Sequence, residues 1–338
     1  MKEEIKLEKR WRIMLVISSD EQKSLVDMNE IIECVAVALK EFSANRTITP
    51  IRAALPFNND QNTALIMPSV ADELSSVGLK VVTVAPNNKE LGKKTITGVV
   101  MLSDFKTGEP IALLEGSYLT MIRTGALSGV ATKYLSREDS KKLCIIGTGE
   151  QANGLVEAIV AVRDIEEILL YNRTEQKAHE FAEYIRNKFD KHVQVYSDPN
   201  EAVRKADIIV TTTNSSTPVF SESLKPGAHI NAVGSFRPTM QELPSHALSS
   251  AHKVVVESKE AALEETGDII IPINEGVFDL DDIFGELGQI VDGKLKGRES
   301  SEEITLFKSV GLAIVDIVVA KYFYEKAVKN KMGTSINL

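Results

Sequence analysis

One short stretch, Lys142–Ala152, constrains the fold more than any other part of the chain. It begins with the apolar run Leu143–Ile146, which is typical of a buried parallel strand, and then turns through Gly147 and Gly149. Apolar residues recur at helical spacing over the following segment, Gly154–Ala161. A strand, a Gly-x-Gly turn and a helix, in this order, form the phosphate-binding corner of a dinucleotide-binding fold. The glycines permit a tight turn and close approach of a pyrophosphate, whose charge the helix N-terminus attracts.

A second strand at the expected distance favours nucleotide binding over a purely structural glycine turn. This strand ends in Tyr171, Asn172, Arg173 and Thr174, where NAD-binding sites usually carry an acid that binds the ribose hydroxyls. A carboxylate would repel a 2′-phosphate, whereas Arg173 can grip one while Asn172 and Thr174 add neutral hydrogen bonds. The sequence therefore predicts NADP(H) as the preferred cofactor, with NAD(H) possible. The alternative is that Arg173 is a solvated residue at a helix start.

Composition excludes several classes of protein. The chain has 338 residues, which is enough for two domains, and a net charge of −9, which argues against nucleic-acid binding. Its apolar runs are too short for a membrane span or a secretory signal, so we expect no membrane partner and a cytoplasmic location. Cys34 and Cys144 lie in apolar segments, which predicts buried thiols. The five histidines show no ligand spacing, and we expect no metal site.

The order of the expected elements separates two regions. A strand at 11–18 and a helix at 28–42 precede several short β segments between residues 48 and 115, which predict an antiparallel or mixed sheet with a hairpin loop at 104–110. A helix at 118–133 then leads into alternating strands and helices. This alternation predicts a Rossmann-type doubly wound parallel sheet of about six strands.

The rest of the chain completes this α/β assignment. We interpret residues 272–297 as an acidic loop and residues 306–329 as one long helix that packs back on the first region. The expected domains are an α+β domain of residues 1–120 with 312–338, and an NADP(H)-binding Rossmann domain of residues 121–311.

Three basic residues of the first region lie in apolar surroundings: Arg52, Lys80 and Arg123. A cation in such a setting needs an anionic partner. Internal salt bridges with Asp or Glu are one explanation. The other is that the three cations converge on a substrate carboxylate beside a nicotinamide.

With these residues, the chain resembles the ornithine cyclodeaminase/μ-crystallin family. The resemblance implies that Arg52, Lys80 and Arg123 bind a substrate carboxylate, that Met67 belongs to the same site, and that the first domain binds substrate and forms a homodimer interface. This favours the carboxylate clamp over the salt bridges. The matching segments span nearly the whole chain: Arg52, Met67-Pro68, Gly78-Leu79-Lys80-Val81-Val82, Gly108-Glu109-Pro110, Arg123-Thr124-Gly125-Ala126, Gly147-Thr148-Gly149-Glu150-Gln151, Tyr171-Asn172-Arg173, Asn231-Ala232-Val233-Gly234, Gln241-Glu242-Leu243 and Phe307-Lys308-Ser309-Val310-Gly311-Leu312-Ala313.

The fold and the resemblance together imply a set of cofactor contacts along the carboxyl ends of the expected strands. These residues are Thr124, Gly147, Thr148, Gly149, Glu150, Gln151, Asn172, Arg173, Thr174, Thr212, Thr213, Val233, Gly234, Lys308, Ser309 and Gly311.

One position departs from the family's namesake reaction. Ornithine cyclodeaminases and the related alanine dehydrogenases carry an Asp shortly after a Val-Gly pair, where this chain has Phe236. Deamination needs a group that accepts the ammonium proton, and an aromatic ring cannot do so. The segment Gly234–Pro238 instead resembles that of the cyclic ketimine reductases of the family.

The resemblance therefore implies an NAD(P)H-dependent reductase of a small cyclic imino acid. The expected reaction converts Δ1-pyrroline-2-carboxylate to L-proline, and piperideine-2-carboxylate to pipecolate is a further possibility. Lys80 is the candidate catalytic residue, because it can polarise or protonate the imine nitrogen, although an ordered water could serve instead. The alternatives are an ornithine cyclodeaminase, an alanine-type amino-acid dehydrogenase, and a μ-crystallin-like NADP-dependent binding protein.

Overall fold

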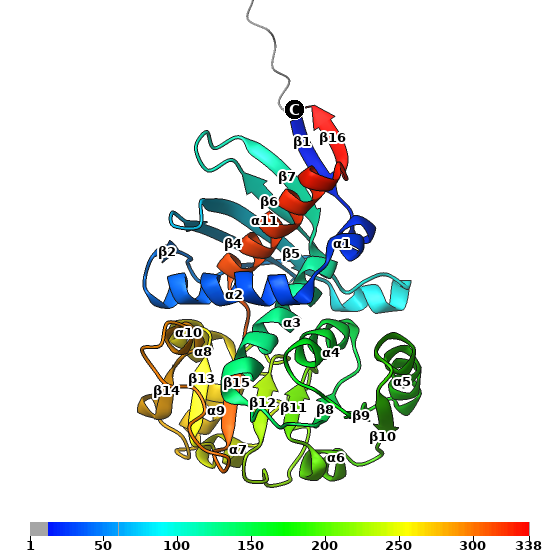
Figure 1. Ribbon diagram of the computed structural model, residues 1–338, viewed down its shortest axis with the longest axis vertical. Helices are drawn as coiled ribbons and strands as arrows, with labels where there is room; N and C mark the ends of the chain where they lie inside the picture. Colours follow the sequence, from blue (N-terminus) through cyan, green and yellow to red (C-terminus); the bar gives the residue numbers. More distant parts are fainter. Residues whose placement is uncertain (1–12, 60, 338) are drawn as a thin grey trace, which may run out of the picture.

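The computed structural model describes residues 13–337 except residue 60, and they build two sheets with helices between and around them (Figure 1). The first sheet has eight strands in the order β16-β1-β7-β6-β5-β4-β2, with β3 also paired to β4. The pair β1–β7 is parallel and the other neighbours are antiparallel, which confirms the predicted mixed sheet. The strands are β1 (Ile13–Ile17), β2 (Thr47–Ile48), β3 (Ala53–Phe57), β4 (Asn62–Ala71), β5 (Ser76–Val84), β6 (Ile96–Ser103), β7 (Pro110–Glu115) and β16 (Thr334–Asn337).

The second sheet is a doubly wound parallel sheet, as the Rossmann prediction required. Its order is β10-β9-β8-β11-β12-β15-β13-β14, and every neighbouring pair is parallel. It has eight strands, so the expectation of about six was too low. The strands are β8 (Lys142–Ile146), β9 (Glu167–Tyr171), β10 (His192–Val195), β11 (Ile208–Thr211), β12 (His229–Ala232), β13 (Lys253–Val256), β14 (Ile283–Glu286) and β15 (Thr305–Lys308).

Two sequence predictions near the C-terminus were wrong, and together they account for the missed strands. Residues 305–308 form β15 between β12 and β13, so the last helix begins at Ala313 and not near residue 306. Residues 272–297 contain β14, the end of one helix and two further helical segments as well as loop. The two missed strands, IFGE and TLFK, each carry only two large apolar residues, which is too few for a buried-strand pattern to stand out.

Helices lie between the sheets and around the second one. They are α1 (Ser19–Leu25), α2 (Met28–Ser43), α3 (Gly116–Leu135), α4 (Glu150–Val162), α5 (Glu175–Phe189), α6 (Pro199–Lys205), α7 (Ser245–Ser249), α8 (Lys259–Glu265), α9 (Gly267–Asn274), α10 (Leu287–Val291) and α11 (Ala313–Asn330), with 3-10 turns η1 (Pro86–Leu91) and η2 (Leu280–Asp282). No helix in the described part of the chain is long and apolar enough to cross a membrane.

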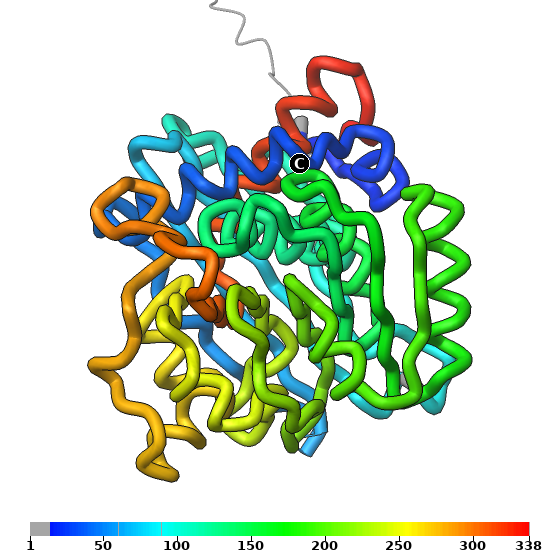
Figure 2. The backbone as a smooth tube through the Cα atoms, turned by 60° about the horizontal axis from the view of Figure 1, so that its bottom comes forward, coloured from blue at the N-terminus to red at the C-terminus, as the bar shows by residue number. Residues whose placement is uncertain are grey.

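Two helices join the sheets. Helix α3 is buried along most of its length and leads directly from β7 toward β8, as predicted. Helix α2 contacts α3, α4, α10 and α11, and Figure 2 shows its path from a second direction. Helix α11 packs across β4, β5 and β6. The division into two domains remains our proposal.

The two sheets meet at the carboxyl end of the second sheet. Lys94, which follows η1, pairs with Glu150 at the start of α4, and Arg52 pairs with Glu265 at the end of α8. Strand β8 lies between β9 and β11, where the strand order reverses. Open parallel sheets bind their ligands at this switch point, outside the carboxyl ends of the strands.

Candidate active site

The loop after β8 has the backbone geometry that a dinucleotide phosphate requires. Gly147 has a φ of +100°, and a Cβ there would lie 2.6 Å from the carbonyl oxygen of Thr212. A Cβ on Gly149, which caps α4, would meet nothing within 4 Å. The buried side-chain atoms Thr148 Oγ1 and Gln151 Oε1 have no hydrogen-bond partner among the described residues. Open space, unpaired polar atoms and a helix N-terminus together fit a bound pyrophosphate.

The end of β9 leaves one cation available beside this loop. Asn172 accepts a hydrogen bond from the Thr148 backbone N–H at 3.2 Å and donates to the Thr174 carbonyl at 2.9 Å. Arg173 is exposed and has no hydrogen bond or ion pair to any other described residue. Its guanidinium is therefore free to bind an anion next to the ribose position.

The buried acid Glu242 holds the ends of β11 and β12 through hydrogen bonds. The Glu242 carboxylate accepts hydrogen bonds from the backbone N–H groups of Thr213, Gly234 and Ser235, at 2.7 Å from Gly234. Burial raises the pKa of Glu242, and the nearby Asp268 raises it further. This carboxylate thereby fixes the backbone at two of the predicted cofactor positions, Thr213 and Gly234, and at the neighbouring Ser235.

Two of the predicted cofactor residues, at the end of β15, already have protein partners. Lys308 is fully buried, and its Nζ lies 2.9 Å from Asp268 Oδ2. Ser309 donates to Glu257 at 3.0 Å. We infer that these side chains position the strand ends, and their direct contact with a cofactor stays a prediction. The remaining predicted contacts on this side are Val233, which is half-buried, and Thr124, whose hydroxyl donates to the Thr120 carbonyl at 2.7 Å.

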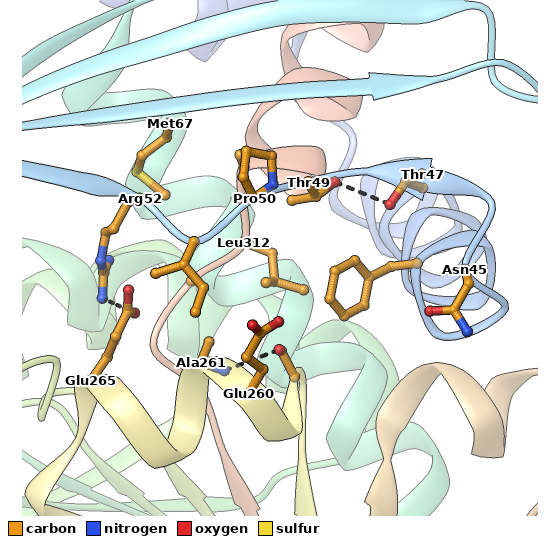
Figure 3. A pocket seen from close by; sticks show the side chains of 15 residues that line it. Asn45, Thr47, Thr49, Pro50, Arg52, Met67, Glu260, Ala261, Glu265 and Leu312 are labelled. Atoms are coloured by element: carbon orange, nitrogen blue, oxygen red, sulfur yellow. Dashed lines mark hydrogen bonds and ion pairs between the residues drawn. The ribbon is translucent and has the colours of Figure 1, made fainter.

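A cavity of about 180 Å³ lies between the first sheet and α8 (Figure 3). Arg52 and Met67 line it, and the Arg52 side chain points toward Glu265. Arg52 Nη1 donates to the Val310 carbonyl at 3.1 Å, while Nη2 pairs with Glu265. Burial raises the pKa of Glu265, although the Arg52 charge opposes this shift.

Lys80 and Arg123 share one buried carboxylate, that of Asp316. Lys80 Nζ lies 2.8 Å and Arg123 Nε 3.0 Å from Asp316 Oδ1. Asp316 is 0% exposed, Lys80 2% and Arg123 7%. Burial lowers the pKa of Lys80 to about 8, although the Asp316 charge opposes this shift.

Gly311 connects this buried cluster to the cavity. It lines the cavity and has a φ of +91°, and a Cβ there would lie 2.8 Å from Arg123 Nη1 and 2.9 Å from Nη2. Any other residue at this position would therefore press on the Arg123 guanidinium. The Nη1 and Nη2 groups of Arg123 donate no hydrogen bond to any described residue.

The structure shows the internal ion pairs of the three cations, and the carboxylate clamp stays a prediction for the same residues. Each cation forms an internal ion pair, as one alternative expected. Arg52, Met67 and Gly311 line the cavity, and Lys80 is opposite Met67 in the β4–β5 register. Among the described residues, Lys80 and Arg123 do not line this cavity. Their binding of a substrate carboxylate stays a prediction.

Three acids organise this site, and none was predicted from the sequence: Asp316, Glu265 and Glu257. Asp316 was visible as the sole acid in the apolar run from residue 310 to residue 320. A lone acid in such a run is expected to be buried and paired. Glu265 lies in the acidic segment 264–268, which looks like any solvated helix end, and Glu257 gave no signal either.

Position 236 carries an aromatic side chain, although the surrounding site contains several carboxylates. Phe236 is half-buried, and the Arg237 guanidinium lies 5.5 Å from its ring centroid. The preceding residue, Ser235, forms a hydrogen bond of 2.7 Å with the hydroxyl of Thr266, and Thr266 directly follows Glu265 in the chain. Across the described residues, no group of three or more His, Cys, Asp or Glu side chains could hold a metal ion.

Comparison with known proteins agrees with this geometry. The sequence matches the ornithine cyclodeaminase/mu-crystallin family over residues 13–331. A Delta(1)-pyrroline-2-carboxylate reductase of Bacillus cereus is 70% identical over 323 residues, which cover 96% of this chain and 99% of the relative. The structure of Thermococcus litoralis Delta(1)-pyrroline-2-carboxylate reductase in complex with NADH and L-proline has a TM-score of 0.91 at 41% identity, over 96% of this chain and 100% of that chain.

A third protein shares the fold with a different activity. An archaeal alanine dehydrogenase dimer with bound NAD has a TM-score of 0.90 at 35% identity, over 96% of this chain and 99% of that chain. The family match and the 70% identity extend over nearly the whole chain, and they confirm the resemblance that the sequence motifs indicated. The chain belongs to the ornithine cyclodeaminase/mu-crystallin family.

Proposed function

We propose that this protein is a nicotinamide-dependent reductase that converts Δ1-pyrroline-2-carboxylate to L-proline. The observation that carries this proposal is the pair of features near the carboxyl end of the second sheet: the glycine loop after β8, which fits a dinucleotide, and the cavity beside α8, which Arg52 and Gly311 line. The 70% identical relative carries this reductase's name, and L-proline is bound in the structure of the Thermococcus protein.

The cations hold the substrate through its carboxylate. Arg123 uses only Nε for Asp316, which leaves its two terminal nitrogens for a bidentate contact. Arg52 already contacts Val310 and Glu265, but its guanidinium has five N–H donors, so some remain for the substrate. Two guanidinium groups on one carboxylate fix the orientation of a small ring, which is what hydride transfer requires.

Lys80 supplies the proton. When bound, the reduced nicotinamide supplies the hydride that adds to the ring carbon of the C=N bond. The Lys80 ammonium donates a proton to the ring nitrogen as the C=N bond is reduced, directly or through water. Its pKa of about 8 suits this task, because a general acid works best when its pKa is near the working pH.

The cofactor is NADPH in preference to NADH, on the strength of Arg173. This side chain is exposed and without a partner among the described residues, at the strand end where an acid would select NAD. The relatives bind NADH and NAD in their structures, so we propose that NADH also serves, with lower affinity.

We further propose a homodimer formed through the first sheet. Strand β3 is exposed throughout, with Leu55 at 53% and Phe57 at 44%, and Ile96 and Val99 of β6 are also exposed. Exposed apolar side chains gathered on one sheet are typical of a protein interface. Light scattering should give the mass of two chains for the wild type and of one chain for Phe57→Asp. A monomeric wild-type protein would refute this.

A cytoplasmic location accompanies this proposal. Both Cys34 and Cys144 are free, which suits a reducing compartment. Fractionation of cells that express the tagged protein would test this location. We expect the protein in the cytoplasmic fraction, and its recovery outside the cytoplasm would contradict the proposal.

Initial rates with several substrates test the proposed reaction. We expect NADPH oxidation with Δ1-pyrroline-2-carboxylate, and a lower rate with piperideine-2-carboxylate. Ornithine should release little ammonia, because position 236 offers no base, and pyruvate with ammonia should oxidise little NADPH. A higher rate with ornithine or with pyruvate would replace the proposal, and cofactor binding without any turnover would indicate a binding protein.

A further inference from the structure

One buried acid of the site has no part in the mechanism as described so far. Asp316 Oδ1 accepts from both Lys80 and Arg123, whereas its Oδ2 is buried without any hydrogen-bond partner among the described residues. A carboxylate has lone pairs for about four donors. Asp316 accepts from only two donors among the described residues, and both are cations that bind the same oxygen. Its charge therefore acts mainly on Lys80 and Arg123.

Three charged side chains and burial set the proton affinity of Lys80. Asp316 on α11 raises the proton affinity of Lys80, whereas Arg123 on α3 and Arg52 before β3 lower it, as does burial on β5. Asp316 is the sole anion among these influences on Lys80. Without it, a buried amine beside two guanidinium groups would readily lose its proton.

We propose that Asp316 is a positioning residue for the reduction, which holds Lys80 beside Arg123 and keeps the Lys80 amine protonated until the proton is transferred. This inference rests on the proposed reductase function. It explains why two cations share one carboxylate oxygen, which a structural ion pair would not require.

The proton balance of the reaction gives Arg123 a matching role. Hydride adds to the ring carbon, the C=N π bond becomes an N–H bond with the Lys80 proton, and Lys80 is left as a neutral amine. Asp316 stays ionised and would then be an unpaired buried charge, except that Arg123 still contacts it at 3.0 Å. Lys80 regains its proton from solvent after product release.

The variant Asp316→Asn tests this proposal. In the wild type, kcat/KM for Δ1-pyrroline-2-carboxylate should fall at alkaline pH as Lys80 loses its proton. An opposite charge within hydrogen-bond distance shifts a pKa by about 1–3 units, so the alkaline limb of Asp316→Asn should move to lower pH by that amount. NADPH affinity, measured by fluorescence titration, should stay within about twofold of the wild type.

A matched control separates this effect from lost stability. Asp207 pairs with Lys225 Nζ at 2.8 Å and accepts from the Lys141 and Lys142 backbone N–H groups, just before β11 and so away from the carboxyl ends. Asp207→Asn should lower stability without moving the pH profile. If the pH profile of kcat/KM were the same for Asp316→Asn and Asp207→Asn, the proposal would be overturned.

Direct titration of Lys80 keeps the test independent of activity. The protein would be labelled with ¹³C at the lysine Cε atoms. The resonance that is missing from the NMR spectrum of Lys80→Met belongs to Lys80. The titration midpoint of this resonance should be lower in Asp316→Asn than in the wild type. An unchanged midpoint would overturn the proposal even if the protein proved not to be a reductase. If Asp316→Asn did not fold, the wild-type midpoint should match the alkaline limb of kcat/KM, and a mismatch would equally refute it.

Discussion

Replacing Lys80 with methionine should damage catalysis far more than it damages folding. Lys80 is 2% exposed and its ammonium lies 2.8 Å from Asp316. Removing one partner of a buried ion pair costs about 3–5 kcal/mol of unfolding free energy. Asp316 keeps its contact with Arg123 at 3.0 Å, so we expect the lower end of that range, about 3 kcal/mol.

The catalytic loss comes from the missing proton donor. General acid catalysis contributes about 10²–10⁴-fold to a rate, so kcat/KM of Lys80→Met should fall by at least about 100-fold. The assay is NADPH oxidation with Δ1-pyrroline-2-carboxylate, alongside urea unfolding and fluorescence titration of NADPH. Cofactor affinity should change little, because Lys80 lies in the first sheet and the phosphate loop follows β8.

A second buried lysine provides the control. Lys253 is 5% exposed, pairs with Glu299 at 2.8 Å and lies at the start of β13, whose other end leads to α8. Lys253→Met should therefore cost comparable stability while kcat/KM stays near that of the wild type. The reasoning would be refuted if both variants lost equal activity, or if Lys80→Met lost NADPH affinity as steeply as turnover.

Three further changes test other parts of the site. Arg173→Ala should weaken NADPH binding by about 1.5–3 kcal/mol, as expected for a hydrogen bond to a charged group, and leave NADH nearly unaffected; equal losses in fluorescence titrations would remove the 2′-phosphate role. Gly311→Ala should raise KM for the imine at least severalfold, since its Cβ would lie 2.8 Å from Arg123 Nη1; an unchanged KM would show that Arg123 does not hold the carboxylate. Phe236→Asp should still release little ammonia from ornithine, because Arg237 lies beside the new carboxylate and would pair with it; rapid release would show that one base is sufficient.

The sequence predicts well those features that depend on neighbouring residues. The turn through Gly147 and Gly149 requires only a local strand–loop–helix pattern, and this pattern also predicts the doubly wound sheet. Arg52, Lys80 and Arg123 were identifiable because a cation in an apolar segment is conspicuous by itself.

The missed features depend on contacts between distant parts of the chain. Asp316 is 236 residues from Lys80 and 193 from Arg123, and no local pattern reveals that α11 brings them together. The same holds for Glu265, which follows Arg52 by 213 residues. Most of strand β15 was assigned to a helix because Leu306 and Phe307 extend the apolar run that leads into α11, and only the pairing with β12 and β13 fixes β15 as a strand.

Transfer of a labelled hydride tests the central claim most directly. The protein would be incubated with Δ1-pyrroline-2-carboxylate and NADPH that carries deuterium at both C4 positions, and the product analysed by mass spectrometry. We expect L-proline with one deuterium on its α-carbon, formed in proportion to the NADPH consumed. Absence of labelled proline, while the same preparation binds NADPH and releases ammonia from ornithine, would contradict it.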